Sequence, residues 1–206
     1  MPQSLTPPVD WRNSKLESEL LQSDLWVFAY GSLIWNPEFE PEAREHVSVR
    51  GFSRKLCIAS YRYRGTKVLP GLVFGLISSC PQDQCEGVSI KVPLEGRAKI
   101  LDMLWHRELL NNVYIPTFID THTSNQSAIR ALAFVVDTAH PQYMPNLDEK
   151  SASERINMAV GLRGPNVDYV FNTHRALKAH GICDHSLEMV VSLLDSGSDS
   201  QRRKDS

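Results

Sequence analysis

The sequence has little cysteine and almost no net charge, and each shortage excludes a class of protein. Its four cysteines in 206 residues are too few for a disulfide framework. Cys80 and Cys85 flank a turn and could form a bridge, but two reduced thiols are the favoured state. The formal net charge of −2 gives no overall basic field that would attract nucleic acid or acidic lipid.

Long apolar runs are also missing. The longest apolar window, residues 25–35, is too short to cross a bilayer and is interrupted by Gly31 and Ser32. The first four residues, Met1–Ser4, carry no positive charge, and no apolar region typical of a secretory signal follows them. We therefore expect a soluble, reduced, cytoplasmic protein without a membrane partner.

The pattern of apolar residues predicts strands in the first two-thirds of the chain, interrupted by one helix. Ile100, Leu101, Leu104 and Trp105 recur at helical spacing and predict a helix over residues 95–110. Strand-like runs, separated by Pro, Gly and charged turns, occur at residues 25–30, 47–59, 71–78, 87–92, 114–120 and 128–136. Six strands with one inserted helix predict a small closed or strongly curved sheet, mostly antiparallel.

The last third of the chain is predicted to be helical. A capping box at Ser151–Glu154 opens one helix, Pro165 opens a second that Gly181 ends, and Asp184 caps a third. The expected fold class is therefore α+β, a small closed or curved sheet with an inserted helix and C-terminal helices.

One compact domain is expected, over residues 25–195. Residues 1–24 form a lead-in, in which Leu16, Leu20 and Leu21 indicate a short helix. The tail over residues 196–206 is polar and poor in aliphatic side chains, which predicts disorder.

The segment Tyr30-Gly31-Ser32-Leu33 is the most informative in the chain, because it directly follows the apolar run of residues 25–29. Gly31 can take a positive φ, and a switch from strand to loop at that point can turn several backbone N–H groups toward one position. Such a group of donors can hold an anion or a developing oxyanion.

Glu108 lies four positions after Leu104, so it shares a helical face with a core residue. Partial burial there would raise the pKa of its carboxyl group toward the range of a general base. A solvated carboxylate at a helix end is the plain alternative. Tyr114, Tyr143 and Tyr169 are candidate pocket phenols, or else core rings whose hydroxyls reach water.

Two other clusters suggest different functions. The basic and aromatic stretch over residues 50–67 could bind single-stranded nucleic acid, although a solvated hairpin is favoured in an acidic chain. His174, His180, Cys183 and His185 could hold a metal ion, but their spacing matches no familiar zinc pattern. The sequence contains no G-x-S-x-G elbow that would indicate a serine hydrolase.

Taken together, these segments resemble the ChaC family of γ-glutamylcyclotransferases, especially its bacterial members. The resemblance covers residues 24–195. Its matching segments, in chain order, are Val27–Pro37, Arg64–Thr66 with Pro70-Gly71, Leu104–Glu108 with Tyr114–Thr117, His140–Tyr143 and Gly161–Tyr169. The chain departs from the family at Asn111-Asn112-Val113, where a glycine is common, and in the glycine spacing of residues 161–166.

The resemblance implies an enzyme that cleaves the γ-glutamyl amide of glutathione by attack of the substrate's own α-amine, giving 5-oxoproline and cysteinylglycine. It implies no metal or organic cofactor, a small-molecule substrate and no nucleic-acid partner. Glu108 would be the catalytic base and acid, with substrate bound by Tyr30, Gly31, Ser32, Leu33, Arg64, Tyr114, Tyr143 and Tyr169. The alternatives are ring closure on other γ-glutamyl amino acids or amines, and a non-catalytic module that binds a small acid.

Overall fold

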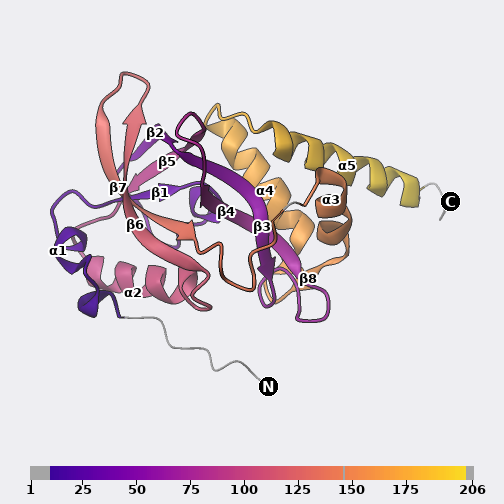
Figure 1. The fold of residues 1–206 in the computed structure, drawn as a ribbon, viewed down its shortest axis with the longest axis horizontal. Helices are drawn as coiled ribbons and strands as arrows, with labels where there is room; N and C mark the ends of the chain where they lie inside the picture. The colour runs from indigo at the N-terminus through magenta and orange to yellow at the C-terminus, as the bar shows by residue number, and fades with distance from the viewer. Residues whose placement is uncertain (1–9, 146, 203–206) are drawn as a thin grey trace.

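A computed structural model describes residues 10–145 and 147–202, and its centre is a closed barrel of five strands (Figure 1). The barrel order is β1, β5, β2, β6 and β7, and a parallel pairing of β7 with β1 closes it. The strands of the main sheet are β1 Trp26–Ala29, β2 Arg44–Arg50, β3 Phe52–Ser60, β4 Gly71–Ser78, β5 Gln84–Lys91, β6 Tyr114–Thr123 and β7 Ala128–Val136.

Strands β4 and β3 extend the barrel outward from β7. Strand β4 pairs with β7 in parallel, where Leu76 lies opposite Val135, and β3 pairs with β4 antiparallel along its length. The remaining pairings inside the barrel are antiparallel. The expected mostly antiparallel, closed sheet of an α+β protein is confirmed.

Two groups of helices cover different sides of the sheet (Figure 1). Helix α2, the expected insertion between β5 and β6, lies on one side, while α3, α4 and α5 lie together on the other. The bounds are η1 Trp11–Asn13, α1 Glu17–Leu20, η2 Ser32–Ile34, α2 Arg97–Glu108, α3 Glu149–Met158, α4 Asn166–Ala179 and α5 His185–Arg202. A two-stranded hairpin, β8 Val160–Gly161 and β9 Gly164–Pro165, joins α3 to α4.

Helix α2 is fixed along its buried face and at its start. Leu101, Leu104 and Trp105 are buried in the main core, as helical spacing predicted. Arg97 is buried as well, and its guanidinium donates hydrogen bonds to the carbonyl groups of Gln22, Ser23 and Val92. These contacts order the first turn, and so they set the direction in which the far end of the helix points.

Two boundaries differ from the sequence prediction. The run expected as one strand over residues 47–59 is divided into β2 and β3, because Gly51 takes a φ of 77° and reverses the chain. Helix α3 begins earlier than the capping box indicated. The side chain of Asp148 accepts a hydrogen bond from the backbone N–H of Ser151 at 2.7 Å and is the true cap.

Helix α5 continues into the segment for which composition predicted disorder. Its cap is as expected, since the Asp184 side chain accepts a hydrogen bond from the N–H of Leu187 at 3.0 Å. The helix extends to Arg202, because a helix that is already nucleated adds residues with little further cost. Residues 203–206 and the lead-in residues 1–9 lie outside the described residues, and the domain limits 25–195 stay a prediction.

The structure also bears on three inferences from composition. All four cysteines are free thiols, so Cys80 and Cys85 form no bridge. No helix within residues 10–145 and 147–202 is both long and apolar enough to cross a membrane. Over the same residues, no group of three or more His, Cys, Asp or Glu side chains is placed to hold a metal ion, the histidines around Gly181 included.

Candidate active site

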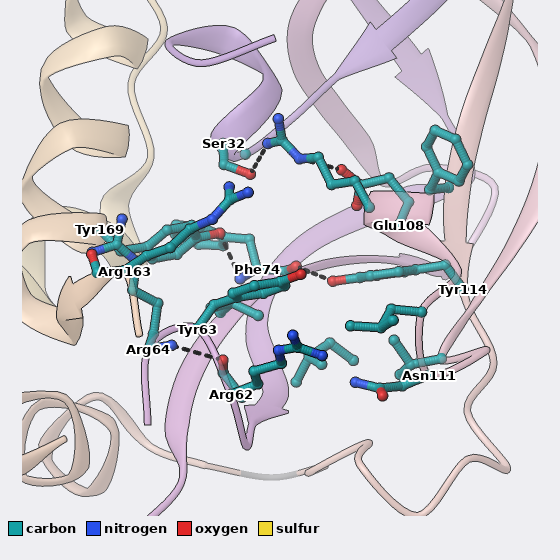
Figure 2. Close-up of a pocket in the computed structure, with 18 of the residues that line it drawn as sticks. Ser32, Arg62, Tyr63, Arg64, Phe74, Glu108, Asn111, Tyr114, Arg163 and Tyr169 are labelled. Atoms are coloured by element: carbon teal, nitrogen blue, oxygen red, sulfur yellow. Dashed lines mark hydrogen bonds and ion pairs between the residues drawn. The ribbon is translucent and has the colours of Figure 1, made fainter. Parts of the chain in front are cut away.

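A cavity of about 190 Å³ lies where the loop after β1, the end of α2, the β3–β4 connection and α4 meet (Figure 2). These segments are far apart in the sequence, and the barrel brings them together. The labelled side chains include Ser32, Glu108, Tyr114, Tyr169 and Arg62. Aromatic rings and arginines make up much of the lining, which suits a small ligand that carries negative charge.

The loop after β1 is held rigidly on both sides. Trp35 donates a hydrogen bond from its ring nitrogen to Thr173 Oγ1 of α4 at 3.1 Å, and Arg44 donates to the Ile34 carbonyl at 3.2 Å. The short helix η2 starts at Ser32. Within the described chain, no residue accepts a hydrogen bond from the backbone N–H groups of Gly31, Ser32 or Leu33. Donors in this arrangement can bind an anion.

Gly31 does not use the positive φ that is open to a glycine. Gly31 has a φ of −143°, because the chain turns by a 3₁₀ bond from Ile34 N–H to the Gly31 carbonyl. A Cβ atom added to Gly31 would lie 3.4 Å from the hydroxyl oxygen of Tyr169. A side chain at this position would therefore occupy space inside the cavity between the loop and Tyr169.

Glu108 is the last residue of α2 and lines the cavity. Only 15% of its side chain is exposed, and one carboxylate oxygen lies 3.0 Å from Arg107 Nε. Burial raises the pKa of the Glu108 carboxyl group above its usual range, while the charge of Arg107 opposes that shift. The net direction is upward, which brings the carboxylate closer to the strength of base that works near neutral pH.

Arg107 links Glu108 to the loop after β1. In addition to Glu108, its guanidinium donates hydrogen bonds to Ser32 Oγ at 2.9 Å and to the Asn36 carbonyl at 2.6 Å. It also lies 3.3 Å from Glu38 Oε1, and only 8% of its side chain is exposed. One buried arginine therefore fixes the distance between the candidate base and the loop amides.

Three buried tyrosine hydroxyls differ in what they can offer to a ligand. Tyr30 donates its proton to the Phe134 carbonyl at 2.7 Å, and Tyr114 donates to the Phe74 carbonyl at 3.0 Å. Tyr169 instead accepts a hydrogen bond from the Phe74 backbone N–H at 3.0 Å (Figure 2). Burial raises the pKa of Tyr169, so its hydroxyl stays protonated and can donate into the cavity.

The family follows from this arrangement together with a comparison of whole sequences. A buried carboxylate at the end of the inserted helix lies beside a loop of unpaired amides, as the resemblance stated above requires. A family model described as ChaC-like protein matches residues 25–196. This chain belongs to the ChaC-like family. The match covers the barrel, the inserted helix and the three C-terminal helices.

ChaC-like relatives of this chain are known in several organisms. It is 29% identical over 173 residues to the glutathione-specific gamma-glutamylcyclotransferase of Escherichia coli (strain K12), covering 84% of this chain and 74% of that protein. It is 28% identical over 171 residues to the protein of the same name from Schizosaccharomyces pombe, covering 76% and 84% respectively.

A solved structure shares the fold of this ChaC-like chain. The crystal structure of a γ-glutamyl cyclotransferase specific to glutathione from yeast superposes with a TM-score of 0.77 at 20% identity. The match covers 85% of this chain and 97% of that one. At that identity the likeness establishes the fold alone.

The structure brings together nearly all the site residues predicted for the ChaC-like chain. Those that line the one cavity are Tyr30, Gly31, Ser32, Leu33, Arg64, Glu108, Tyr114 and Tyr169. Their roles in binding and catalysis stay predictions. Arg64 is buried, and its guanidinium donates to the carbonyls of Arg163 at 2.7 Å and Pro165 at 3.1 Å. It therefore holds the β8–β9 hairpin beside the cavity.

Tyr143 is the exception, because it does not line the cavity. Its side chain packs with a separate small core cluster that includes Cys57 and Val136. The neighbouring Gln142 lines the cavity in its place and donates a hydrogen bond to the Ala59 carbonyl at 2.7 Å. The sequence pattern identified the right segment but not which of two adjacent residues faces inward.

Sequence reasoning gave no role to three arginines that line the cavity. Arg107 lies next to Glu108 in a motif that was noted, and its position beside a candidate base was the available signal. Arg62 was considered only within the basic and aromatic stretch. Arg163 lies in the matching segment Gly161–Tyr169, of which only the glycine spacing was considered. The stretch does not form one nucleic-acid surface, since Arg54 is buried in an ion pair with Asp184 at 2.8 Å and Arg64 also points inward.

Proposed function

We propose that this chain is a γ-glutamylcyclotransferase that acts on glutathione and releases 5-oxoproline and cysteinylglycine. One observation carries the proposal. Glu108, a largely buried carboxylate with a raised pKa, lines the same cavity as the unpaired amides of Gly31–Leu33. The E. coli and S. pombe relatives, both named glutathione-specific gamma-glutamylcyclotransferases, support the choice of glutathione.

The residues of the cavity fit ring closure within the substrate. The substrate's α-amine nitrogen attacks the γ-amide carbonyl carbon, and the tether between them makes the effective concentration high. Glu108 takes a proton from that amine and delivers it to the cysteinyl nitrogen as the amide bond breaks. No covalent bond to the protein forms, so no nucleophilic side chain is required.

The loop after β1 and Tyr169 supply the electrostatic part. The amides of Gly31, Ser32 and Leu33 donate either to the oxyanion that develops on the carbonyl oxygen or to the substrate's α-carboxylate. Tyr169 adds a neutral O–H donor close to Gly31. Because these donors are held in place before the substrate binds, they stabilise negative charge without reorganising.

Two other readings are distinguished by experiment. A non-catalytic module would be favoured if Glu108 were ion-paired and closed off from any cavity; Glu108 is ion-paired with Arg107, but it lines the cavity. Ring closure on other γ-glutamyl compounds uses the same chemistry. Purified protein is therefore incubated with equal concentrations of glutathione, γ-glutamylalanine and a γ-glutamyl amine, and 5-oxoproline is quantified.

Replacement of Glu108 tests the mechanism itself. We expect Glu108→Gln to fold normally and to lower the rate of 5-oxoproline release by about 10²–10⁴-fold, because the amide cannot act as a base. The exposed Glu95, which precedes the same helix, provides the matched control: Glu95→Gln keeps wild-type activity. Full activity in Glu108→Gln would remove the proposed mechanism.

A further inference from the structure

Four arginines line the cavity, and three of them are already engaged by the protein. Arg107 binds Glu108 and Glu38, and Arg163 lies 2.9 Å from Glu38 Oε1. Arg64 is buried and donates to two backbone carbonyls of the β8–β9 hairpin. Arg107 and Arg163 are therefore already ion-paired within the protein, and Arg64 already donates its hydrogen bonds to the backbone.

Arg62 differs from the other three. Its side chain is exposed at the cavity, and within the described chain its guanidinium has no carboxylate or carbonyl partner. Its guanidinium lies over the ring of Tyr63, with the guanidinium carbon 5.7 Å from the ring centroid. The ring of Tyr63 is covered by Arg163 as well, at 4.7 Å. The backbone here is fixed, because the Arg62 carbonyl accepts a hydrogen bond from Leu162 N–H at 2.8 Å.

The position of Arg62 is well separated from the reacting groups. Figure 2 shows Ser32 and Glu108 at one side of the cavity and Arg62 at the opposite side, with Tyr63 and Phe74 between them. A ligand that places its γ-glutamyl amide beside Glu108 has room to extend its other end toward Arg62. Glutathione carries a second carboxylate at that end, on the glycyl residue, and an arginine fork matches a carboxylate in shape and charge.

We propose that Arg62 binds the glycyl carboxylate of glutathione and makes the cavity selective for γ-glutamyl donors with an anionic tail. The inference rests on the proposed function, and it identifies the residue that binds the cysteinylglycine part of the substrate, which is the leaving group. Tyr63 supports the guanidinium through its ring face, which limits the conformations that must be ordered on binding. Arg163 stays ion-paired with Glu38, and its positive charge adds to the electrostatic attraction of the cavity for a carboxylate.

The test compares glutathione with its monoethyl ester, in which the glycyl carboxylate is uncharged. Both ligands are titrated by calorimetry into the Glu108→Gln protein, so that affinity is measured without turnover. We expect glutathione to bind about ten- to one-hundredfold more tightly than the ester, as a hydrogen-bonded ion pair requires. In Glu108→Gln with Arg62→Ala, both ligands should bind with the affinity of the ester.

Two further variants make the result specific. Arg62→Lys keeps the charge but loses the fork, so it should retain part of the preference for glutathione. Lys67→Ala removes an exposed charge from the same connection without touching the cavity lining, and it should leave the preference unchanged. Ester binding by each variant reports on folding, because that ligand does not depend on Arg62.

The outcomes separate the two proposals. Equal affinity for glutathione and the ester in Glu108→Gln, or a preference that survives Arg62→Ala, would overturn the role of Arg62. The proposed function is judged by another measurement, the release of 5-oxoproline by the wild-type protein. Absence of that product together with a lost preference in Arg62→Ala would leave a glutathione-binding site and reject the enzyme.

Discussion

At the scale of single residues, the chemistry of the cavity depends on two opposing influences on Glu108. Burial destabilises the charged carboxylate and raises its pKa, whereas the guanidinium of Arg107 favours the charged form. Arg107 is a positioning residue, since it also holds Ser32 and the Asn36 carbonyl. A general base needs both effects, because a pKa that is too high leaves it protonated at neutral pH.

Replacement of Arg107 by glutamine should change the pH dependence of the reaction. Glu108 acts as a base only when ionised, so kcat/KM falls as the pH drops through its pKa. Without the cation, the pKa of Glu108 rises further, and the acidic limb of the pH profile moves to higher pH. The measurement is kcat/KM for glutathione from pH 5 to 9, with 5-oxoproline as product.

Arg107→Lys is the companion variant for this measurement. It retains a positive charge beside Glu108, so its acidic limb should lie nearer that of the wild type, although the hydrogen bonds to the loop are partly lost. A purely structural role would lower the rate at every pH without moving the limb. An acidic limb in Arg107→Gln that coincides with the wild type would therefore contradict the proposed electrostatic role.

At the scale of elements, the β8–β9 hairpin is held against the chain that carries Arg62 and Arg64. A Cβ atom added to Gly161 would lie 2.5 Å from the Gly65 nitrogen and 2.6 Å from the Arg64 nitrogen. No residue with a side chain fits there without displacing backbone. The hairpin is also bonded through Leu162 N–H to the Arg62 carbonyl and through Arg163 N–H to the Tyr63 carbonyl. Gly161 thus sets the position of this side of the cavity.

Gly161→Ala should separate the hairpin from residues 62–65. Forcing a methyl group into this contact costs about 1–3 kcal/mol of folding free energy. For a chain of this size the midpoint of thermal unfolding then falls by roughly 2–12 °C. Calorimetry measures the shift, and the KM for glutathione should rise because Arg62 moves with the hairpin.

The neighbouring Leu162 is a suitable control for that experiment. Its side chain is 76% exposed, so Leu162→Ala should leave the unfolding midpoint nearly unchanged. Wild-type stability and KM in Gly161→Ala would show that the hairpin can move away from residues 62–65 at no cost.

At the scale of the whole molecule, the barrel and the C-terminal helices share one core. Leu187, Val190 and Leu194 of α5 are buried in the same cluster as the barrel strands. Leu194 is buried, whereas Asp195 and Ser196, the last residues whose burial is described, are exposed. The stabilising part of α5 should therefore end near residue 195, where the sequence placed the end of the domain.

A shortened chain that ends at Ser196 tests this boundary. We expect its midpoint of thermal unfolding to lie within about 2 °C of the full chain, and its activity to be unchanged. A chain that ends at Ser186 loses the buried α5 residues and should be strongly destabilised. A large loss of stability in the longer of the two chains would place part of the folded core beyond residue 196.

Prediction from the sequence succeeded where a signal is local. The apolar period of residues 100–105 predicted α2, and Asp184 was correctly identified as a helix cap, because both depend on neighbours within a few positions. Gly31 lines the cavity without the positive φ that was open to it, whereas Tyr143 does not line the cavity. The direction of the Tyr143 side chain is set by its packing against β3 residues such as Cys57 and Ile58, which lie far earlier in the chain, and no local pattern records that contact.

The sequence by itself determined the class of the fold, the inserted helix with Glu108 on its core-facing side, and the loop that follows the first strand. Only the tertiary structure decided that Arg107 joins these two segments and that the Tyr169 hydroxyl, which accepts from Phe74 N–H, can still donate its own hydrogen into the cavity. It also decided that the guanidinium of Arg62 has no ion-pair partner among the described residues, on the side of the cavity opposite Glu108. The reason is physical. Periodicity and capping are properties of a few consecutive residues, whereas closure of the barrel brings together side chains that are scores of positions apart in the chain.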